Sequence, residues 1–371
     1  MEAPGKARIA LFTDSMMGGG AERVMAILAN ELVGRGIAVD LLLVRAVGEY
    51  LSQLSPVVHV VELPASRIAT SVVPLARYLR QARPQCLLST LTAVNLVALL
   101  AHRLSRSPAR MVLREASTLS IAARSTPRLK DRVLPHLAKR AYPLADQIIA
   151  VSKGVANDLH DTWKIPRDKI TVVYNPIVDA DLAQLSAQPA RHPWLEDPDR
   201  PLVLGVGRLT RAKNFALLLR AFALMRRQVP ARLIILGEGE ERAALTDLAR
   251  ELAIAEDVAM PGFADNPFAY MAKASVFVLS SSWEGLPGVL IQAMACGCPV
   301  VSTDCPHGPR EILDEGRIGC LVPTDDPEAL SAGMLAALRG ELRQADPDWL
   351  AQFSTEHIIQ RYLQVLGVAA A

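Results

Sequence analysis

The segment LVLGVGRLTRAKNFALLLRAFALMR, residues 202–226, contains the pattern that decides the fold. An apolar run leads into a glycine-containing loop and then into an Ala- and Leu-rich stretch, which predicts a strand, a loop and a helix. Residues 9–33 have the same order, with a strand at 9–13 and a helix that begins at Ala21. Strands that alternate with crossover helices build parallel sheets, so the predicted class is α/β.

The alternation continues along both halves of the chain. Further strands are predicted at 39–44, 57–61, 86–89, 111–113, 147–152, 171–174, 232–236, 258–260, 276–279, 300–303 and 320–322. Between the halves, residues 182–200 are rich in proline and read as a linker. The sequence therefore predicts two domains, at 1–181 and 201–354, each with its own parallel sheet.

Composition excludes several classes of protein. Of 371 residues, 51% are hydrophobic and 21% charged, and the net charge is +2, which argues against disorder and gives no support to nucleic-acid binding. Five cysteines form no even framework, which indicates a reducing compartment. With neither a signal peptide nor a membrane-spanning segment recognised, the expected location is cytoplasmic.

Two loops have the composition of phosphate-binding sites. Residues 18–23, GGGAER, join the first strand to the first helix, and small residues before a helix N-terminus let backbone N–H groups approach an anion. The loop 205–214 occupies the matching place and adds Arg208, Arg211 and Lys213. For each loop, an interpretation without a ligand remains open: a flexible turn at 18–23 and a solvated basic turn at 205–214. A third glycine turn at 237–239 is flanked by glutamates, so it is assigned to an uncharged part of a nucleotide or to no ligand.

Residues 280–301, SSSWEGLPGVLIQAMACGCPVV, are the most informative block. They resemble the donor-site motif of glycosyltransferase family 4, and segments 18–23, 151–153, 174–176, 206–214, 261–263 and 308–313 resemble its other motifs in order and spacing. The resemblance implies the GT-B fold, in which two Rossmann-like domains face a central cleft. It also implies transfer of a sugar with retention of anomeric configuration. The implied donor is a nucleoside diphosphate sugar, in the first instance a UDP-sugar. The implied acceptor is a glycan or lipid-linked oligosaccharide of surface polysaccharide biosynthesis.

The resemblance assigns roles to individual residues. Arg208 and Lys213 stabilise the departing diphosphate together with the amides of Gly19 and Gly20, and Glu284 binds hydroxyls of the transferred sugar. Further substrate contacts are implied at Asn175, Gly207, Gly237, Gly262, Phe263, Gly285, Leu286, Pro287, Gly288, Val289 and Gln292. Pro287 has no N–H to donate. The resemblance further implies that a C-terminal helix, 355–371, packs on the first domain.

Two positions depart from the family pattern. Gln292 stands where the second glutamate of the pattern binds ribose, so one carbonyl acceptor is kept and the charge is lost. After the strand at 111–113, the chain has Arg114 and Glu115 where many relatives have a histidine. Two interpretations of this pair remain open: contact with donor or acceptor, or a salt bridge on the surface.

No metal or other cofactor is expected. Asp197-Pro198-Asp199 and Asp346-Pro347-Asp348 match Asp-x-Asp but lie in proline-rich connectors, so they are interpreted as turns. Cys296 and Cys298 lack further ligands at zinc spacing. The acidic run that begins at Asp325 is predicted to cap a helix that starts at Pro327.

The stretch 102–140 contains ten basic residues against two acidic ones, interleaved with apolar side chains. It is predicted either to rest on an anionic membrane surface, making the protein peripheral on the inner face of the cell membrane, or to be a solvated helical face.

Two rival functions were weighed against the transferase. A nucleotide-dependent oxidoreductase would require an intact Gly-x-Gly-x-x-Gly, which neither loop provides. A non-catalytic scaffold derived from a transferase is suggested by Gln292 and Arg114, but would not be expected to keep Arg208, Lys213 and Glu284.

Overall fold

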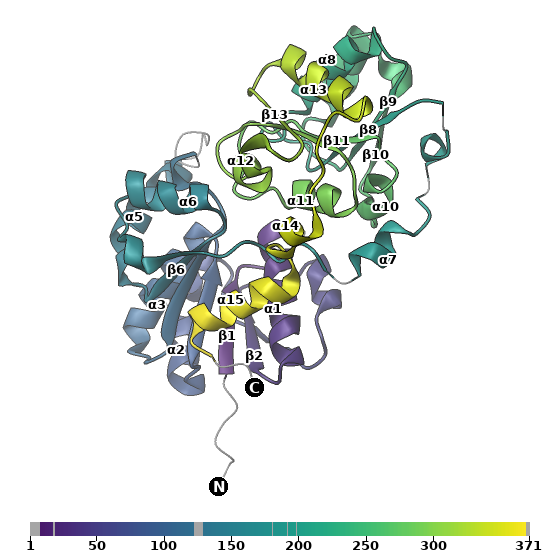
Figure 1. Ribbon diagram of the computed structural model, residues 1–371. Helices are drawn as coiled ribbons and strands as arrows, with labels where there is room; N and C mark the ends of the chain where they lie inside the picture. The colour runs from purple at the N-terminus through teal and green to yellow at the C-terminus, as the bar shows by residue number, and fades with distance from the viewer. Residues whose placement is uncertain are drawn as a thin grey trace. The chain divides into compact units, whose positions relative to one another are not determined.

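The computed structural model describes residues 8–17, 19–121, 129–179, 181–190, 192–197 and 199–368, with only the backbone for 129–132. The chain forms two compact units, one of residues 1–176 and 355–371 and the other of residues 177–354 (Figure 1). Each unit has its own sheet and its own apolar core.

The first unit is built on a seven-stranded sheet with the order β3-β2-β1-β4-β5-β6-β7, in which every pairing is parallel. Its strands are β1 (Arg8–Thr13), β2 (Ala38–Leu43), β3 (His59–Glu62), β4 (Cys86–Thr90), β5 (Arg110–Glu115), β6 (Gln147–Ala150) and β7 (Ile170–Val172). The order reverses between β1 and β4, which is where ligands bind in doubly wound sheets.

Helices cover this sheet because each has one apolar side. They are α1 (Gly20–Gly34), α2 (Val72–Ala82), α3 (Thr92–Ser105), α5 (Leu129–Ala141), α6 (Lys153–Asn157) and α15 (Thr355–Leu366). Although α15 comes last in the sequence, Ile359 and Tyr362 are buried in the same core as Met25 and Leu28 of α1. Helix α15 therefore belongs to the first unit.

The second unit has a six-stranded parallel sheet with the order β10-β9-β8-β11-β12-β13. Its strands are β8 (Leu202–Val206), β9 (Arg232–Leu236), β10 (Val258–Gly262), β11 (Val276–Leu279), β12 (Val300–Thr303) and β13 (Cys320–Val322). Its helices are α7 (Leu182–Ser186), α8 (Phe215–Arg226), α9 (Arg242–Glu251), α10 (Pro267–Met271), α11 (Gly288–Ala295), α12 (Pro309–Ile312), α13 (Pro327–Leu338) and α14 (Pro347–Ala351). Here the order reverses between β8 and β11.

The α/β class and all thirteen predicted strands are confirmed. The strand predicted at 57–61 lies two residues too early, because Val57 is 72% exposed and the pairing with β2 begins at His59. The predicted helix cap is also confirmed, since the Asp326 carboxylate accepts a hydrogen bond from the N–H of Ala329 at the start of α13.

Residues 182–200 were expected to be a linker, but they contain α7 and a 3₁₀ turn, η6 (Pro193–Leu195), and group with the second unit. The Asn266 amide donates a hydrogen bond to the Leu185 carbonyl at 2.8 Å, and Arg232 pairs with Asp197 at 3.0 Å. These polar contacts hold the segment on the second unit, a feature that its proline content does not reveal.

Candidate functional site

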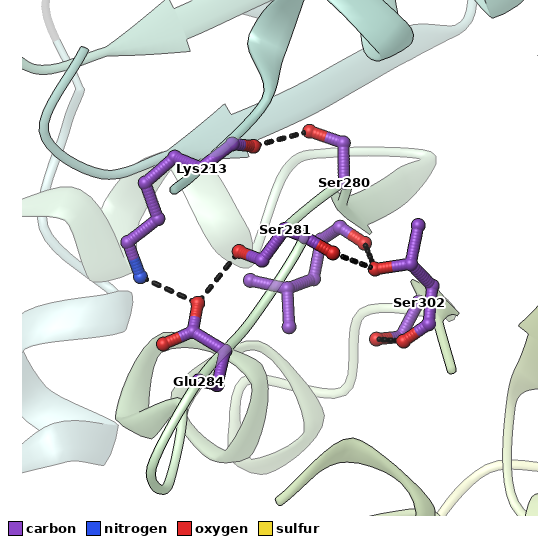
Figure 2. A network of polar contacts seen from close by, with 7 residues as sticks. Lys213, Ser280, Ser281, Glu284 and Ser302 are labelled. Atoms are coloured by element: carbon purple, nitrogen blue, oxygen red, sulfur yellow. Dashed lines mark hydrogen bonds and ion pairs between the residues drawn. The ribbon is translucent and has the colours of Figure 1, made fainter. Parts of the chain in front are cut away.

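The candidate site lies at the carboxyl ends of β8 and β11, where the strand order of the second sheet reverses. The loop after β8 supplies Lys213, and the loop after β11 supplies Glu284 (Figure 2). Because β8 and β11 are hydrogen-bonded neighbours, two residues 71 positions apart in sequence come into contact.

Lys213 and Glu284 form an ion pair in which the lysine Nζ lies 2.6 Å from the carboxylate Oε1. The hydroxyl of Ser281 donates to the same oxygen, also at 2.6 Å. The side chains of Lys213 and Glu284 are only 22% and 11% exposed. Both contacts use Oε1, so the carboxylate is held in place while its other oxygen remains an acceptor for a ligand hydroxyl.

A layer of hydrogen bonds beneath this pair fixes the two loops to each other. The Ser280 hydroxyl donates to the Lys213 carbonyl at 2.9 Å, and the Ser282 N–H donates to the Ala212 carbonyl at 2.8 Å. The hydroxyl of Thr303, at the end of β12, donates to the Ser281 carbonyl at 2.6 Å. Ser280, Ser281 and Thr303 are at most 1% exposed, so the charged pair rests on a rigid support.

Arg208 lies in the same loop as Lys213 but in a different environment. Its side chain is exposed, and it has no ion-pair partner within the part of the chain that the structure describes. An exposed cation without a carboxylate beside it can accept an external anion at little cost, because no existing pair has to be broken.

Three glycines line the ends of β8, β9 and β10. The Gly237 N–H donates to the Gly262 carbonyl at 2.8 Å, and the Gly207 N–H donates to the Leu236 carbonyl at 2.9 Å. Gly237 has a φ of +135°, and a Cβ there would lie 2.0 Å from the Gly207 carbonyl oxygen, so no larger residue fits. Phe263, beside Gly262, is 73% exposed and offers an aromatic face at this edge of the sheet.

The loop 284–288 leads from Glu284 into helix α11. Pro287 is the N-cap residue, so Gly288 and Val289 lie in the first turn, where N–H groups have no partner within the helix. Gly285 and Val289 are half-buried and Leu286 is buried. Gln292, one turn further along, is only 5% exposed.

The buried thiol of Cys305 is close enough to the charged pair to interact with it electrostatically. Burial and the negative charge of Glu284 raise the pKa of the Cys305 thiol to about 12, so the thiol stays protonated.

In the first unit, Gly19 is the N-cap of α1 and Gly20 is its first residue. A Cβ at Gly19 would lie 2.1 Å from an oxygen of Glu22, so a larger residue there would require the flexible Glu22 side chain to move. Gly18, part of the same motif, lies outside the described residues.

Arg114 and Glu115 are both fully buried, so the surface salt bridge considered for this pair is wrong. The Arg114 guanidinium donates to Thr90, Asn175 and Tyr362. Direct contact of either residue with a substrate stays a prediction.

The Glu115 carboxylate occupies a separate polar pocket of the same unit. It accepts hydrogen bonds from Thr92, Ser117 and Tyr142. Burial raises the pKa of Glu115, although these hydrogen bonds pull it the other way.

The two Asp-x-Asp segments take part in turns and caps. Asp197 accepts a hydrogen bond from the N–H of Asp199, and Asp346 caps α14 through the N–H of Trp349. Across the described residues, no three His, Cys, Asp or Glu side chains gather in an arrangement that could hold a metal ion.

Sequence reasoning missed the supporting residues Ser281 and Thr303. Ser281 stands in the quoted motif and Thr303 ends a predicted strand, but neither position signals a contact with Glu284 or its loop. The one sequence feature that could have pointed to Ser281 and Thr303 is a hydroxyl residue at or just after the carboxyl end of a buried strand.

Both halves of the chain match known protein families. Residues 18–181 match the family Glycosyltransferase Family 4, and residues 187–348 match the family Glycosyl transferases group 1. A Campylobacter jejuni protein, N-acetylgalactosamine-N,N'-diacetylbacillosaminyl-diphospho-undecaprenol 4-alpha-N-acetylgalactosaminyltransferase, is 36% identical over 68% of this chain and 66% of its own length. The lipopolysaccharide core biosynthesis glycosyltransferase LpsE of Rhizobium meliloti is 34% identical over 60% of this chain and 64% of its own length. These matches thus span slightly less than two thirds of either relative.

Among solved structures, the Anabaena protein HepE in complex with UDP has a TM-score of 0.79 at 20% identity, over 97% of this chain and 99% of its own. This likeness shows the fold, which is the expected GT-B architecture of two Rossmann-like parallel-sheet domains. The two family matches together account for most of the chain and include Lys213 and Glu284. The chain therefore belongs to glycosyltransferase family 4.

Proposed function

We propose that the protein transfers a sugar from a nucleoside diphosphate sugar, most simply a UDP-sugar, to a lipid-linked oligosaccharide or growing surface glycan, with retention of anomeric configuration. The observation that carries the proposal is the switch point of the second sheet, where Lys213 pairs with Glu284 and the exposed Arg208 lies in the same loop as Lys213.

In the proposed reaction, the bond between the anomeric carbon and the diphosphate oxygen breaks while the acceptor hydroxyl forms a new bond to that carbon on the same face. Negative charge grows on the leaving diphosphate, so the cations of Arg208 and Lys213 stabilise the transition state more than the ground state. The leaving phosphate oxygen accepts the proton of the acceptor hydroxyl. Gly19 and Gly20 are proposed as further amide donors to the diphosphate, and no metal is required.

The sugar and nucleoside are assigned to the surrounding loops. The free oxygen of Glu284 accepts hydrogen bonds from sugar hydroxyls, with the amides of the 285–289 segment beside it. Gln292 is proposed to accept from ribose through its one carbonyl oxygen. The glycine turns at 207, 237 and 262 allow close approach of the nucleoside, and Phe263 offers its exposed ring to the base.

The acceptor class is proposed from the relatives. The name of the Campylobacter jejuni protein describes an acceptor on diphospho-undecaprenol, and that of LpsE describes lipopolysaccharide core biosynthesis. Both acceptors are anchored in lipid, which agrees with a membrane-facing surface on this chain.

We propose that such a surface lies on α3 and α5, which pack against each other. Leu100 and Leu104 on α3, and Val133 and Leu137 on α5, are 44–57% exposed. Exposed basic residues accompany them at Arg103, Arg106, Lys139 and Arg140. Within the described residues, no helix combines the length and the apolar character that crossing a membrane requires. We therefore propose a peripheral, cytoplasmic-face location in which this surface rests on anionic lipid.

The transfer itself is tested by incubating the purified protein with a panel of UDP-, GDP- and ADP-sugars and synthetic undecaprenyl diphosphate oligosaccharides. One donor should give a lengthened glycan whose new linkage, read by NMR coupling constants, keeps the donor's anomeric configuration. An inverted product would reject retention. No product from any donor, with nucleotide binding intact, would favour a scaffold, and turnover of NAD or NADP would favour an oxidoreductase.

The membrane proposal is tested separately with liposomes. Binding should require anionic lipid and weaken with salt, and a Leu104→Glu/Leu137→Glu variant should lose it. Equal binding to neutral vesicles, or no change in the variant, would identify this surface as a solvated helical face.

A further inference from the structure

Strand β10, at the edge of the second sheet, is irregular near its carboxyl end. It advances three residues, from Ala259 to Gly262, while its partner β9 advances two, from Ile234 to Leu236, so the register shifts within this stretch. Such a bulge bends a strand and redirects the side chains that follow it, and bulges are frequent beside binding sites. Here Gly262 ends the strand with a φ of +98°, and the exposed Phe263 follows. The bulge therefore decides where this aromatic ring lies.

Arg242, the first residue of α9, bridges the bulge. Its Nη1 group donates to the carbonyl of Met260 at 3.0 Å, inside the shifted stretch. Its Nη2 group donates to the carbonyl of Gly237 at 3.2 Å, in the turn after β9. Nε and Nη2 also donate to the two carboxylate oxygens of Glu238, at 2.7 and 2.6 Å. One guanidinium thus joins the end of β10 to the turn that follows β9.

The position of Arg242 in its helix is not explained by helix stability. A helix N-terminus carries partial positive charge, so a cation is disfavoured in the first turn. The ion pair with Glu238 adds little, because the two side chains are 34% and 57% exposed. What distinguishes Arg242 is its two backbone carbonyl partners, which a planar guanidinium reaches in fixed directions that a lysine ammonium does not reproduce.

The turn that Arg242 holds lies between two loops of the candidate site. The Gly237 N–H donates to the Gly262 carbonyl at 2.8 Å, and the Leu209 N–H donates to the Glu238 carbonyl at 2.8 Å. The Glu238 carboxylate lies against Gly262, since a Cβ there would be 2.8 Å from its Oε1. From the sequence, the glutamates of this turn counted against a phosphate-bearing ligand. The charge of Glu238 is balanced by Arg242, so it is a weaker argument against a nucleotide here.

We propose that Arg242 is a positioning residue for the donor nucleoside: by holding the carbonyls of Gly237 and Met260, it fixes the turn and the bulge on which the nucleoside rests. The inference rests on the proposed function for its ligand, but not for its effect on the turn and the bulge. Every contact that carries it lies within the second unit. Arg242 needs no contact with the ligand, and the reacting diphosphate is assigned to Arg208 and Lys213. Its effect should therefore fall on binding of the donor rather than on the rate of transfer.

The structural test compares Arg242→Lys with Arg250→Lys. Arg250 lies on the same helix in an exposed ion pair with Asp247, so its replacement perturbs α9 but removes no contact to Gly237 or Met260. Hydrogen exchange of a peptide containing Gly237 should rise about tenfold in Arg242→Lys and less than about twofold in Arg250→Lys, because only the first change releases the turn. Arg242→Gln, which keeps an amide donor on a shorter side chain, should also raise exchange and serves if Arg242→Lys does not fold.

The functional readout is the split between donor KM and kcat. Arg242→Lys should raise donor KM about tenfold, the effect of misplacing about one hydrogen bond to the nucleoside, and keep kcat within about threefold. Titration calorimetry with UDP, GDP and ADP should show the same weakening of Kd for the nucleotide that binds the wild-type protein. Arg250→Lys should leave both KM and Kd within about twofold of wild type.

Two results would overturn the inference at different steps. Unchanged exchange at Gly237 in both Arg242 variants would overturn the positioning of the turn, whether or not transfer is observed. Faster exchange with unchanged Kd and donor KM, or a loss confined to kcat, would overturn the link to the nucleoside. If the wild-type protein binds none of the three nucleoside diphosphates, the proposed function fails and the nucleoside role with it, while the exchange comparison still decides whether Arg242 holds the turn.

Discussion

Replacing Lys213 by Met tests the charged pair most sharply, because methionine keeps an unbranched apolar chain and removes only the ammonium. At 2.6 Å, and with an effective dielectric constant of about 20, the Coulomb attraction between Lys213 and Glu284 is about 6 kcal/mol before desolvation is subtracted. Breaking an exposed pair costs about 1 kcal/mol or less, and removing one partner of a buried pair costs about 3–5 kcal/mol. Since these side chains are 22% and 11% exposed, we expect a loss of about 2 kcal/mol in the free energy of unfolding.

The double variant Lys213→Met/Glu284→Gln separates the ion pair from other effects. It should be more stable than Lys213→Met alone, with a coupling of about 1–2 kcal/mol, because no unpaired carboxylate remains. Urea unfolding measures the wild type, Lys213→Met, Glu284→Gln and the double variant. Lys273→Met, at an exposed site in the same unit, is the matched control and should change stability by less than about 0.5 kcal/mol. The same Lys213→Met variant should lose on the order of 10²-fold in kcat/KM for transfer. A variant as stable as the control, and within threefold of wild type in kcat/KM, would refute the role given to Lys213.

Three further outcomes are expected. Transfer should survive excess EDTA, and loss of activity that Mg²⁺ or Mn²⁺ restores would contradict the metal-independent reaction. Because burial raises the pKa of Glu115 above its ordinary value, the contribution of this carboxyl group to stability is present at acid pH and declines as the pH rises through the raised pKa. The stability of Glu115→Gln relative to wild type, measured by urea unfolding at a series of pH values, should therefore increase as the pH rises above the ordinary glutamate range, and a pH-independent difference would contradict a raised pKa. Gly237→Ala should lower the midpoint of thermal unfolding by several degrees, because the alanine Cβ would meet the Gly207 carbonyl and the backbone φ at this position is positive. An unchanged midpoint would show that the turn relaxes freely.

Much of the fold could be predicted from local patterns. Buried parallel strands are continuous apolar runs, so segments such as 202–206 and 232–236 are found with their observed bounds. Exposed edge strands are less distinct: β3 is largely exposed, and its predicted range began at the solvent-facing Val57. The segment 182–200 was interpreted as a linker because proline content says nothing of the contacts made by Asn266 and Arg232.

The candidate site was predictable only in part, because sequence motifs name residues but not their partners. The motifs identified Lys213 and Glu284, yet not that they touch, since the pairing of β8 with β11 is a long-range property of the sheet. Arg114 was noticed as a departure from the family pattern, but its burial depends on Tyr362, 248 residues away. Contacts at such separations leave no mark in a single sequence.

The central claim is that the loops at the β8 and β11 ends bind a nucleoside diphosphate. The most direct measurement is the thermal stability of the wild-type protein and Lys213→Met with UDP, GDP, ADP, NAD and NADP in parallel. A nucleotide at about 100 times its Kd should stabilise the folded wild-type protein by about 2.7 kcal/mol. The account predicts such a shift for one nucleoside diphosphate, and its loss in Lys213→Met. Stabilisation by a dinucleotide, or by a nucleoside diphosphate equally in both proteins, would contradict it.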